Sequence, residues 1–419
     1  MSKDASSPTS CAEKGVWTPV PTQPPADTTL SLKSIDPDED ARIATAAKMT
    51  FHMTGCTGDF DDGTSTVAVA GALCGQSDSS FLYHLGDITY TDKKEADGLD
   101  QFKMYNGQFL APYTNYKKSI VAIGGNHDGK NSPVAQQSAV QTFLANFCAD
   151  PKQWPAKWPH NTIDSRPAMI QPYPFWRFDT TLAYFIGLYA NISNGGILDD
   201  PSAFTDYTKG PQYQWLVGQL KDVKQRNEAN SPKRAVLVTV HYPPYSGASN
   251  FNVRGDPQAG QSANESNAPY LAVSLQQAFS DSGQRADALF SAHAHLFQRL
   301  TYTFADGTVM PCLVVGCGGH SIEDLFEECD GTKGPKQQPP FPAVAPGSFQ
   351  FPNGESAQVD AFEDKKHNGM SGFIQVQIES RALTCTFYDT SGAAGDSFEL
   401  DLDKHQYKRT SLFCPGRAD

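Results

Sequence analysis

Four short segments of the chain carry residues that could bind metal ions, and each segment follows an apolar run. The segments are GDITY at 86–90, GGNHD at 124–128, HYPPYS beginning at His241, and SAHAH at 291–295. The runs before them have the length and composition of buried β-strands. Because open α/β sheets bring the carboxyl ends of their strands to one edge, the four segments can meet there despite their separation in sequence.

These residue types suit the metal-assisted hydrolysis of a phosphate ester. A carboxylate can bridge two cations, histidine nitrogens suit zinc or iron, and an amide oxygen can complete a ligand shell. Two metal ions about 3.5–4 Å apart can clamp phosphoryl oxygens and supply a bound hydroxide for in-line attack. A neighbouring histidine can stabilise the transition state or protonate the leaving alkoxide. Each segment alone is also typical of a structural turn, but the ordered set of four favours catalysis.

The ordered set resembles the calcineurin-like metallophosphoesterases, over roughly residues 48–402. The tyrosine in GDITY, the HYPPYS segment and SAHAHLFQR are similar to the purple acid phosphatase branch. QYQWLVGQL at 212–220 and VVGCGG at 314–319 resemble elements that flank the family's later metal-binding strands. The resemblance implies an α/β fold, a four-layer α/β/β/α sandwich with two mixed sheets packed face to face. It also implies an enzyme that hydrolyses phosphate esters, with phosphomonoesters as the expected substrates.

The resemblance assigns a first metal position. It implies that Asp87 bridges both metals, and that Tyr90 and His295 bind the first one. The cofactors expected are therefore two metal ions, iron or zinc or both, with manganese as an alternative. Since a phenolate on ferric iron gives the family its colour, Tyr90 indicates iron in the first position.

The resemblance also assigns the second metal position and the groups around the substrate. It implies that Asn126, His241 and His293 bind the second metal. Asn126 is expected to contact substrate as well, and His127 is expected to be the catalytic acid or phosphate contact. His320, which follows a glycine turn, is a further candidate for binding the phosphate group.

The chain departs from the family at its first motif. The family has an aspartate after its first strand, but here the strand expected at 49–54 runs into GCTG, which puts Cys56 at that position. A thiolate binds zinc or iron well and is softer than a carboxylate. Asp59 could replace the missing carboxylate if the loop bends inward, and Asp61 and Asp62 are weaker alternatives. In a third reading Cys56 is a small buried residue and the first metal is weakly held or absent.

That third reading supports a different function class. A chain with an incomplete metal site would be a non-catalytic or weakly active phosphate-binding protein on the same fold. The polar ligand types after the other strands argue against it, because a scaffold does not need them there.

Several other polar residues are expected to have structural roles. His84 and His52 lie within expected strands and should pack in the interior, and Arg299 should be structural. Tyr245 is a candidate for the wall of the cleft, and His367 is a weaker candidate for a phosphate contact.

The bulk composition bounds the partners. The chain of 419 residues has 33 basic and 46 acidic side chains, a net charge of −13. Such a surface repels nucleic acid and anionic membranes, whereas bound metals can still attract a small phosphorylated substrate. No apolar run approaches the ~20 residues that span a bilayer. The start, MSKDASSPTSCAEKG, has no apolar h-region, which favours a cytoplasmic location. No pattern in the sequence defines an oligomeric state.

The alternation of short apolar runs with helical patterns predicts one α/β domain over residues 46–415. Residues 1–45 are polar and proline-rich and are expected to form an extended arm. A long loop rich in Pro and Gly is expected at about 329–363. The expected strands are 49–54, 81–85, 119–123, 182–188, 234–240, 288–291, 312–315, 373–378 and 383–388, and the expected helices are 133–148, 213–226 and 270–280.

Overall fold

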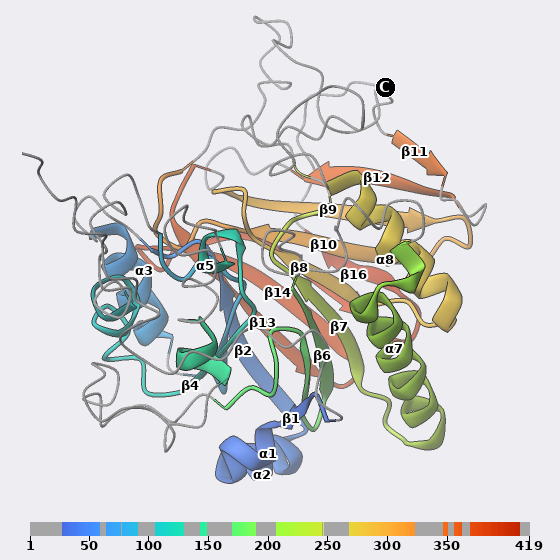
Figure 1. Cartoon of the computed structure of the whole chain (residues 1–419), viewed down its shortest axis with the longest axis horizontal. Coiled ribbons are helices and arrows are strands. Elements are labelled where there is room, and N and C mark those ends of the chain that lie inside the picture. Colours follow the sequence, from blue (N-terminus) through green and yellow to red (C-terminus); the bar gives the residue numbers. More distant parts are fainter. Residues whose placement is uncertain are drawn as a thin grey trace, which may run out of the picture.

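The structure is a computed structural model of the whole chain (Figure 1). It describes residues 27–58, 64–76, 78–90, 105–129, 143–148, 170–189, 207–244, 246, 268–322, 347–350, 356–362 and 369–410.

Two mixed β-sheets form the centre of the fold. One has nine strands, in the order β1 (Thr29–Ser31), β5 (Trp176–Asp179), β6 (Ala183–Leu188), β7 (Ala235–Val240), β8 (Ala288–Ser291), β10 (Val309–Val315), β9 (Phe297–Phe304), β12 (Ser356–Phe362) and β11 (Gly347–Gln350). The other has seven, in the order β16 (Gln406–Thr410), β15 (Ala394–Asp401), β14 (Ala382–Asp389), β13 (Gly372–Glu379), β2 (Lys48–Thr54), β3 (Phe81–His84) and β4 (Ser119–Ala122).

The parallel parts of the two sheets set where the site lies. In the seven-stranded sheet β2, β3 and β4 are parallel neighbours. In the nine-stranded sheet β6, β7, β8 and β10 are parallel neighbours. Parallel strands end together, so the loops after β2, β3 and β4 share one edge, as do those after β7 and β8.

The two sheets pack face to face over one apolar core. Phe51 of β2, Phe185 of β6, Leu237 of β7 and Val376 of β13 all belong to it and are fully buried. The rings of Phe51 and Phe185 meet edge to face, with their centroids 5.0 Å apart.

Helices cover the outer faces of both sheets. α7 (Pro211–Ala229) and α8 (Ala268–Ser282) lie on the nine-stranded sheet, where Leu216 and Val238 belong to one buried cluster (Figure 1). α3 (Thr64–Gly75) packs on the seven-stranded sheet, in a cluster with Leu82 and Ile120. The four-layer α/β/β/α sandwich expected from the sequence is therefore confirmed.

The burial of each strand follows its composition. β7 reads AVLVTV, and every residue is buried because one face meets helices and the other meets the second sheet. β14 reads ALTCTFYD, and its residues alternate between buried and half-buried because only one face is fully covered. Most of the expected strands are present, and the helices expected at 213–226 and 270–280 are α7 and α8.

The expectation of an extended arm over residues 1–45 is wrong for the part that the structure describes. Residues 29–31 form β1, which pairs with β5, and α1 (Leu32–Ile35) and α2 (Pro37–Ala46) follow. The start of α2 carries local helix signals, because the Asp36 side chain accepts from the N–H of Glu39 and Pro37 occupies the first turn. Residues 1–26 lie outside the described residues.

Two further expectations about connections need correction. The loop expected at about 329–363 contains β11 and β12, and β12 extends the sheet by pairing with β9. Of the helix expected at 133–148, the described part begins at 143 and contains one π-helical turn, Leu144–Cys148. β9, β15 and β16 also went unpredicted, because polar residues interrupt their apolar pattern, even in β9, where all residues but one are buried.

Across the described ranges, none of the helices combines the length and the apolar character needed to cross a membrane.

Candidate metal centre

The turn after β3 places Asp87 at the middle of the site. Gly86 has φ 93° and Asp87 has φ 53°, so the chain bends sharply and turns the Asp87 carboxylate inward. A Cβ atom on Gly86 would lie 2.7 Å from the backbone nitrogen of Gly125, and a Cβ on Gly125 would collide with Asp87. Both glycines are therefore required for the close approach of the loops after β3 and β4.

The Asp87 carboxylate is buried and is contacted by three elements. Its Oδ1 accepts from the backbone N–H of His127 at 2.8 Å. Its Oδ2 accepts from the Tyr90 hydroxyl at 3.2 Å and lies 3.2 Å from Nε2 of His241. Burial would raise the pKa of Asp87, but the neighbouring His241 and His127 outweigh it and hold the pKa below its usual range. Asp87 is thus an ionised carboxylate whose Oδ2 is directed at two ligand-type side chains, those of Tyr90 and His241.

One set of candidate ligands gathers around Asn126. Its Oδ1 lies 3.0 Å from Nε2 of His241 and 3.0 Å from Nδ1 of His293. The other ring nitrogen of His241 lies 2.8 Å from the carbonyl oxygen of Leu85, to which it must donate its proton. Nε2 of His241 therefore faces the oxygens of both Asn126 and Asp87, an acceptor-rich position where a positive charge is favoured.

The electrostatics of the two histidines agree with this arrangement. Burial alone would lower the pKa of His241, but the carboxylate of Asp87 raises it overall. His293, with φ 65°, has its pKa lowered by burial and by the charge of His241. A divalent cation bound to these nitrogens would place a positive charge beside the oxygens of Asp87 and Asn126. This set of side chains therefore fits a metal ion.

A second set of candidate ligands gathers around the hydroxyl of Tyr90. Nε2 of His295 lies 3.1 Å from that hydroxyl, and Asp87 contacts it from the other side. The Cys56 thiol is also a hydrogen-bond partner of Tyr90. Ligand atoms of Cys56, Asp87 and His241 all lie within 4.8 Å of one another. Burial and the charges of Asp87 and Cys56 raise the pKa of Tyr90 well above its ordinary value.

Cys56 is positioned by its backbone. It has φ 56°, its N–H donates to the carbonyl of Gly86 at 2.9 Å, and its carbonyl accepts from the N–H of His320 at 3.0 Å. These bonds tie the loop after β2 to the turn that carries Asp87. The structure thus places Cys56 beside Asp87 and Tyr90. Asp59, Asp61 and Asp62 lie outside the described residues.

The ring of Tyr90 lies between two histidines. His320 stacks on it with centroids 3.7 Å apart and planes 4° apart, and His127 packs at 4.2 Å with a tilt of 41°. Nδ1 of His320 lies 2.7 Å from the carbonyl oxygen of Gly58 and so carries a proton, which leaves Nε2 as the other nitrogen of this half-buried ring. His127 is half-buried as well. His127 and His320, two of the residues predicted to contact substrate, therefore border the candidate metal ligands.

Two further residues, Asp128 and Gln108, support the candidate ligands and were not singled out from the sequence. Asp128 accepts from the backbone N–H groups of Ile88 and Gly125, and burial together with the charge of Asp87 raises its pKa to about 7. The amide of Gln108 exchanges two hydrogen bonds with the backbone of Tyr90. Asp128 belongs to the GGNHD segment, so its place in the motif was a visible signal, whereas Gln108 has none.

The residues expected to be structural are placed accordingly. His84 is buried behind the site and contacts the Thr57 hydroxyl at 2.9 Å. His52 packs edge to face on Phe373, on the helix-covered side of its sheet. Arg299 forms a buried ion pair with Asp396. Tyr245 and His367 lie outside the described residues.

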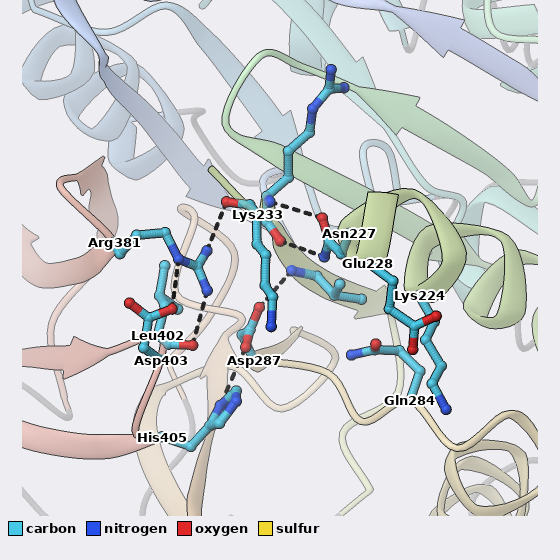
Figure 2. A pocket seen from close by; sticks show the side chains of 12 residues that line it. Lys224, Asn227, Glu228, Lys233, Gln284, Asp287, Arg381, Leu402, Asp403 and His405 are labelled. Carbon is cyan, nitrogen blue, oxygen red and sulfur yellow. Dashed lines mark hydrogen bonds and ion pairs between the residues drawn. The ribbon is translucent and has the colours of Figure 1, made fainter. Parts of the chain in front are cut away.

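The opposite edge of the sheets contains a separate hollow of about 190 Å³ (Figure 2). It lies beside Asp287 at the start of β8, and Arg381, Asp403 and His405 also line it. Two pairs of charged groups in its lining are in contact, since Arg381 lies 3.1 Å from Asp403 and His405 lies 3.3 Å from Asp287. The candidate ligands follow the other ends of β7 and β8, so this hollow is no part of the metal centre.

Comparisons with known proteins agree with this geometry. A family model described as calcineurin-like phosphoesterase matches residues 50–297, a span that includes every candidate ligand from Cys56 to His295. No curated protein matches the chain.

Two solved structures are similar to the chain at low sequence identity, and the first of them shares its fold. One, described as GAP50, the anchor in the inner membrane complex of Plasmodium, is 14% identical, with 84% of this chain and 89% of that chain covered and a TM-score of 0.50. Another, PhoD, is 13% identical, with 88% and 73% covered and a TM-score of 0.46. On the strength of the family match over more than half its length, the chain belongs to the calcineurin-like phosphoesterases, a family that hydrolyses phosphoesters with divalent metal ions.

Proposed function

We propose that this protein hydrolyses phosphate monoesters at a centre that holds two metal ions. The observation that carries the proposal is that two sets of ligand-type side chains share Asp87. Asn126 and His241 form part of one set, and Tyr90 and His295 form part of the other. A buried carboxylate between two such sets is suited to bridging two cations.

The proposed ligands divide as follows. The first ion would be held by Cys56, Asp87, Tyr90 and His295, and the second by Asp87, Asn126, His241 and His293. Metal ions bound there would polarise the phosphoryl oxygens and activate a water molecule for in-line attack.

The chain's own residues then orient the substrate and move a proton. His127 is anchored through its backbone N–H to Asp87, so its ring is held in place beside Tyr90. From there the imidazole can stabilise the developing charge or protonate the leaving alkoxide. Nδ1 of His320 is directed at the carbonyl oxygen of Gly58, so the ring would contact a phosphate oxygen by donating from a protonated Nε2. Asn126 is a proposed substrate contact as well as a ligand.

The ligand types favour iron or zinc at the first position. A thiolate and a phenolate are both anionic, and the thiolate is soft, which suits zinc or iron better than magnesium or calcium. The phenolate of Tyr90 is also the feature that most resembles the purple acid phosphatases. Manganese is the alternative for the second position, where the proposed donors are oxygen and imidazole nitrogen.

A second candidate function rests on Cys56. If the thiol does not bind metal, the first position loses a ligand, and the protein would be a weakly active or non-catalytic phosphate-binding member of the family. The other candidate ligands remain clustered around Asp87, which favours the enzyme.

Metal analysis and hydrolysis assays on the chelator-free protein test the proposal. We expect about two metal ions per chain and faster hydrolysis of p-nitrophenyl phosphate than of its bis-ester. Asp87→Asn should remove both metal and activity, whereas His405→Gln, at the opposite edge, should remove neither. A protein that contains no metal and hydrolyses neither ester, even after loading with zinc, iron or manganese, would overturn it.

A further inference from the structure

The loops after β3 and β4 are joined by two hydrogen bonds, in each of which a carboxylate of one loop accepts from a backbone N–H of the other. Asp87, in the first loop, accepts from the backbone N–H of His127 in the second at 2.8 Å. Asp128, in the second loop, accepts from the backbone N–H of Ile88 in the first at 3.1 Å. Each loop therefore provides a hydrogen-bond acceptor for a backbone N–H of the other. These two bonds fix the position of one loop relative to the other.

The Asp128 carboxylate is fully engaged and lies out of solvent. Its Oδ2 accepts from the N–H of Gly125 at 2.9 Å, and its Oδ1 accepts from the Tyr105 hydroxyl at 3.3 Å. The residue is 2% exposed. Burying a carboxylate this deeply is unfavourable unless hydrogen bonds compensate. The Asp128 side chain therefore stays buried only while its donors hold their positions.

The bonds of Asp128 adjoin the candidate ligands directly. Ile88 is the neighbour of Asp87, and Gly125 is the neighbour of Asn126. Moving either backbone would change the separation between the shared carboxylate and the amide oxygen. The two loops already approach so closely that a Cβ atom on Gly86 or Gly125 would clash with the other loop.

We propose that Asp128 is a positioning residue for the metal centre, which sets the distance between Asp87 and Asn126 and thereby the affinity for metal. This inference rests on the proposed function, since it assigns a role at the same centre. A residue that only stabilises the fold would lower the melting temperature of the metal-free chain without changing metal affinity in the folded protein.

Asp287 provides a matched control. It is also a buried carboxylate, it accepts from a backbone N–H, that of Val236, at 2.6 Å, and it has a histidine partner in His405. It lies at the opposite ends of β7 and β8 from the ligands. Asp287→Asn should therefore reproduce the general cost of altering such a group without touching the centre.

The experiment is zinc titration calorimetry and thermal unfolding on the metal-stripped full-length chain. Asp128→Asn keeps the size of the side chain but directs an NH₂ group at a backbone donor. We expect it to weaken zinc binding by about 10- to 100-fold, the usual effect of losing a group that orients metal ligands. Asp287→Asn should lower the melting temperature and leave zinc affinity within about twofold of the unaltered chain, a bound chosen well below that effect.

The outcomes separate the inference from the proposed function. If the unaltered chain binds no zinc, iron or manganese, the proposed function fails. If it binds zinc and Asp128→Asn binds it equally well, or loses no more affinity than Asp287→Asn, the positioning role is wrong. If Asp128→Asn does not fold, Tyr105→Phe decides, because it removes one of the donors: weaker zinc binding supports the role, and unchanged binding contradicts it.

Discussion

The hydroxyl of Tyr90 and Nε2 of His295 lie 3.1 Å apart, although 205 positions separate the two residues in the sequence. Asp87 contacts the same hydroxyl at 3.2 Å. β3 and β8 belong to different sheets, and the face-to-face packing of these sheets brings the turn after β3 and the loop after β8 together. The Tyr90 oxygen thus lies between two other proposed ligands of the first metal ion.

Tyr90→Phe tests that position. The substitution keeps a ring between His127 and His320 and removes only the oxygen, so we expect the affinity for one of the two metals to fall by about tenfold or more while the other stays bound. If the bound metal is iron, its visible absorption band should disappear. Tyr407→Phe, which removes a half-buried phenol bonded to Thr301 far from the site, is the control. Unchanged binding of both metals would remove Tyr90 from the ligand set.

Substitutions at Cys56 test the thiolate. Cys56→Ala should weaken zinc and cadmium binding, and the ultraviolet charge-transfer absorption of a cadmium thiolate should be lost. Cys56→Asp should shift the preference towards manganese, because a carboxylate is a harder ligand. Aspartate also tolerates the left-handed φ of 56° at this position better than alanine does. A large gain of both metal content and activity in Cys56→Asp would instead support the non-catalytic reading.

His127→Ala tests proton transfer separately from metal binding. We expect kcat to fall by about 10²- to 10⁴-fold, since the ring is the proposed acid. Metal content should not change, because alanine keeps the backbone N–H that His127 donates to Asp87. Rates with leaving groups of increasing acidity provide the check. The defect should shrink as the leaving group needs less protonation, and a constant defect would contradict the assignment.

The ion pair between Arg299 and Asp396 connects the two sheets and is a test of stability. Nε and Nη2 of Arg299 donate to the two carboxylate oxygens at 2.7 and 3.0 Å, and both side chains are buried. Asp396→Ala should lower the free energy of unfolding by about 3–5 kcal/mol, because it leaves a buried charge unpaired. Replacing both partners with Met and Leu should cost less than the single change. Urea unfolding measures both.

An exposed pair gives the matched control for that experiment. Arg409 contacts Glu399 at 3.0 Å, but its side chain is 84% exposed. Arg409→Gln should therefore change the free energy of unfolding by no more than about 1 kcal/mol. An effect as large as that of Asp396→Ala would show that burial is not what makes the inter-sheet pair important.

Glu39 predicts a dependence of stability on pH. Burial would raise its pKa, but hydrogen bonds from Arg42, Ser80 and Lys118 lower it to about 2 from 4.5. The folded pKa is below the unfolded one, so the stabilisation is complete above about pH 4.5 and is lost as the pH falls towards 2. The difference in unfolding free energy between the wild type and Glu39→Gln should therefore be constant near neutrality and shrink below pH 4.5. A difference that grows on acidification would contradict the depressed pKa.

The sequence by itself determined the residue types of the centre and the strand ends that carry them. Apolar runs such as 235–240 identify buried strands locally, and a polar residue directly after such a run, such as His241, can be read without knowing the fold. The resemblance carried by these segments supplied the sandwich, and the family match confirms it.

Only the tertiary structure decided how those strand ends combine. It placed Cys56 among the candidate ligands through a hydrogen bond to Gly86, and it stacked His320 on Tyr90. It also joined the loops after β3 and β4 through the carboxylates of Asp87 and Asp128. Each of these contacts depends on sheet order and on left-handed turns, which join residues far apart in the chain. Local composition contains no record of such distances, because strand order, turn geometry and the packing of the two sheets set them together.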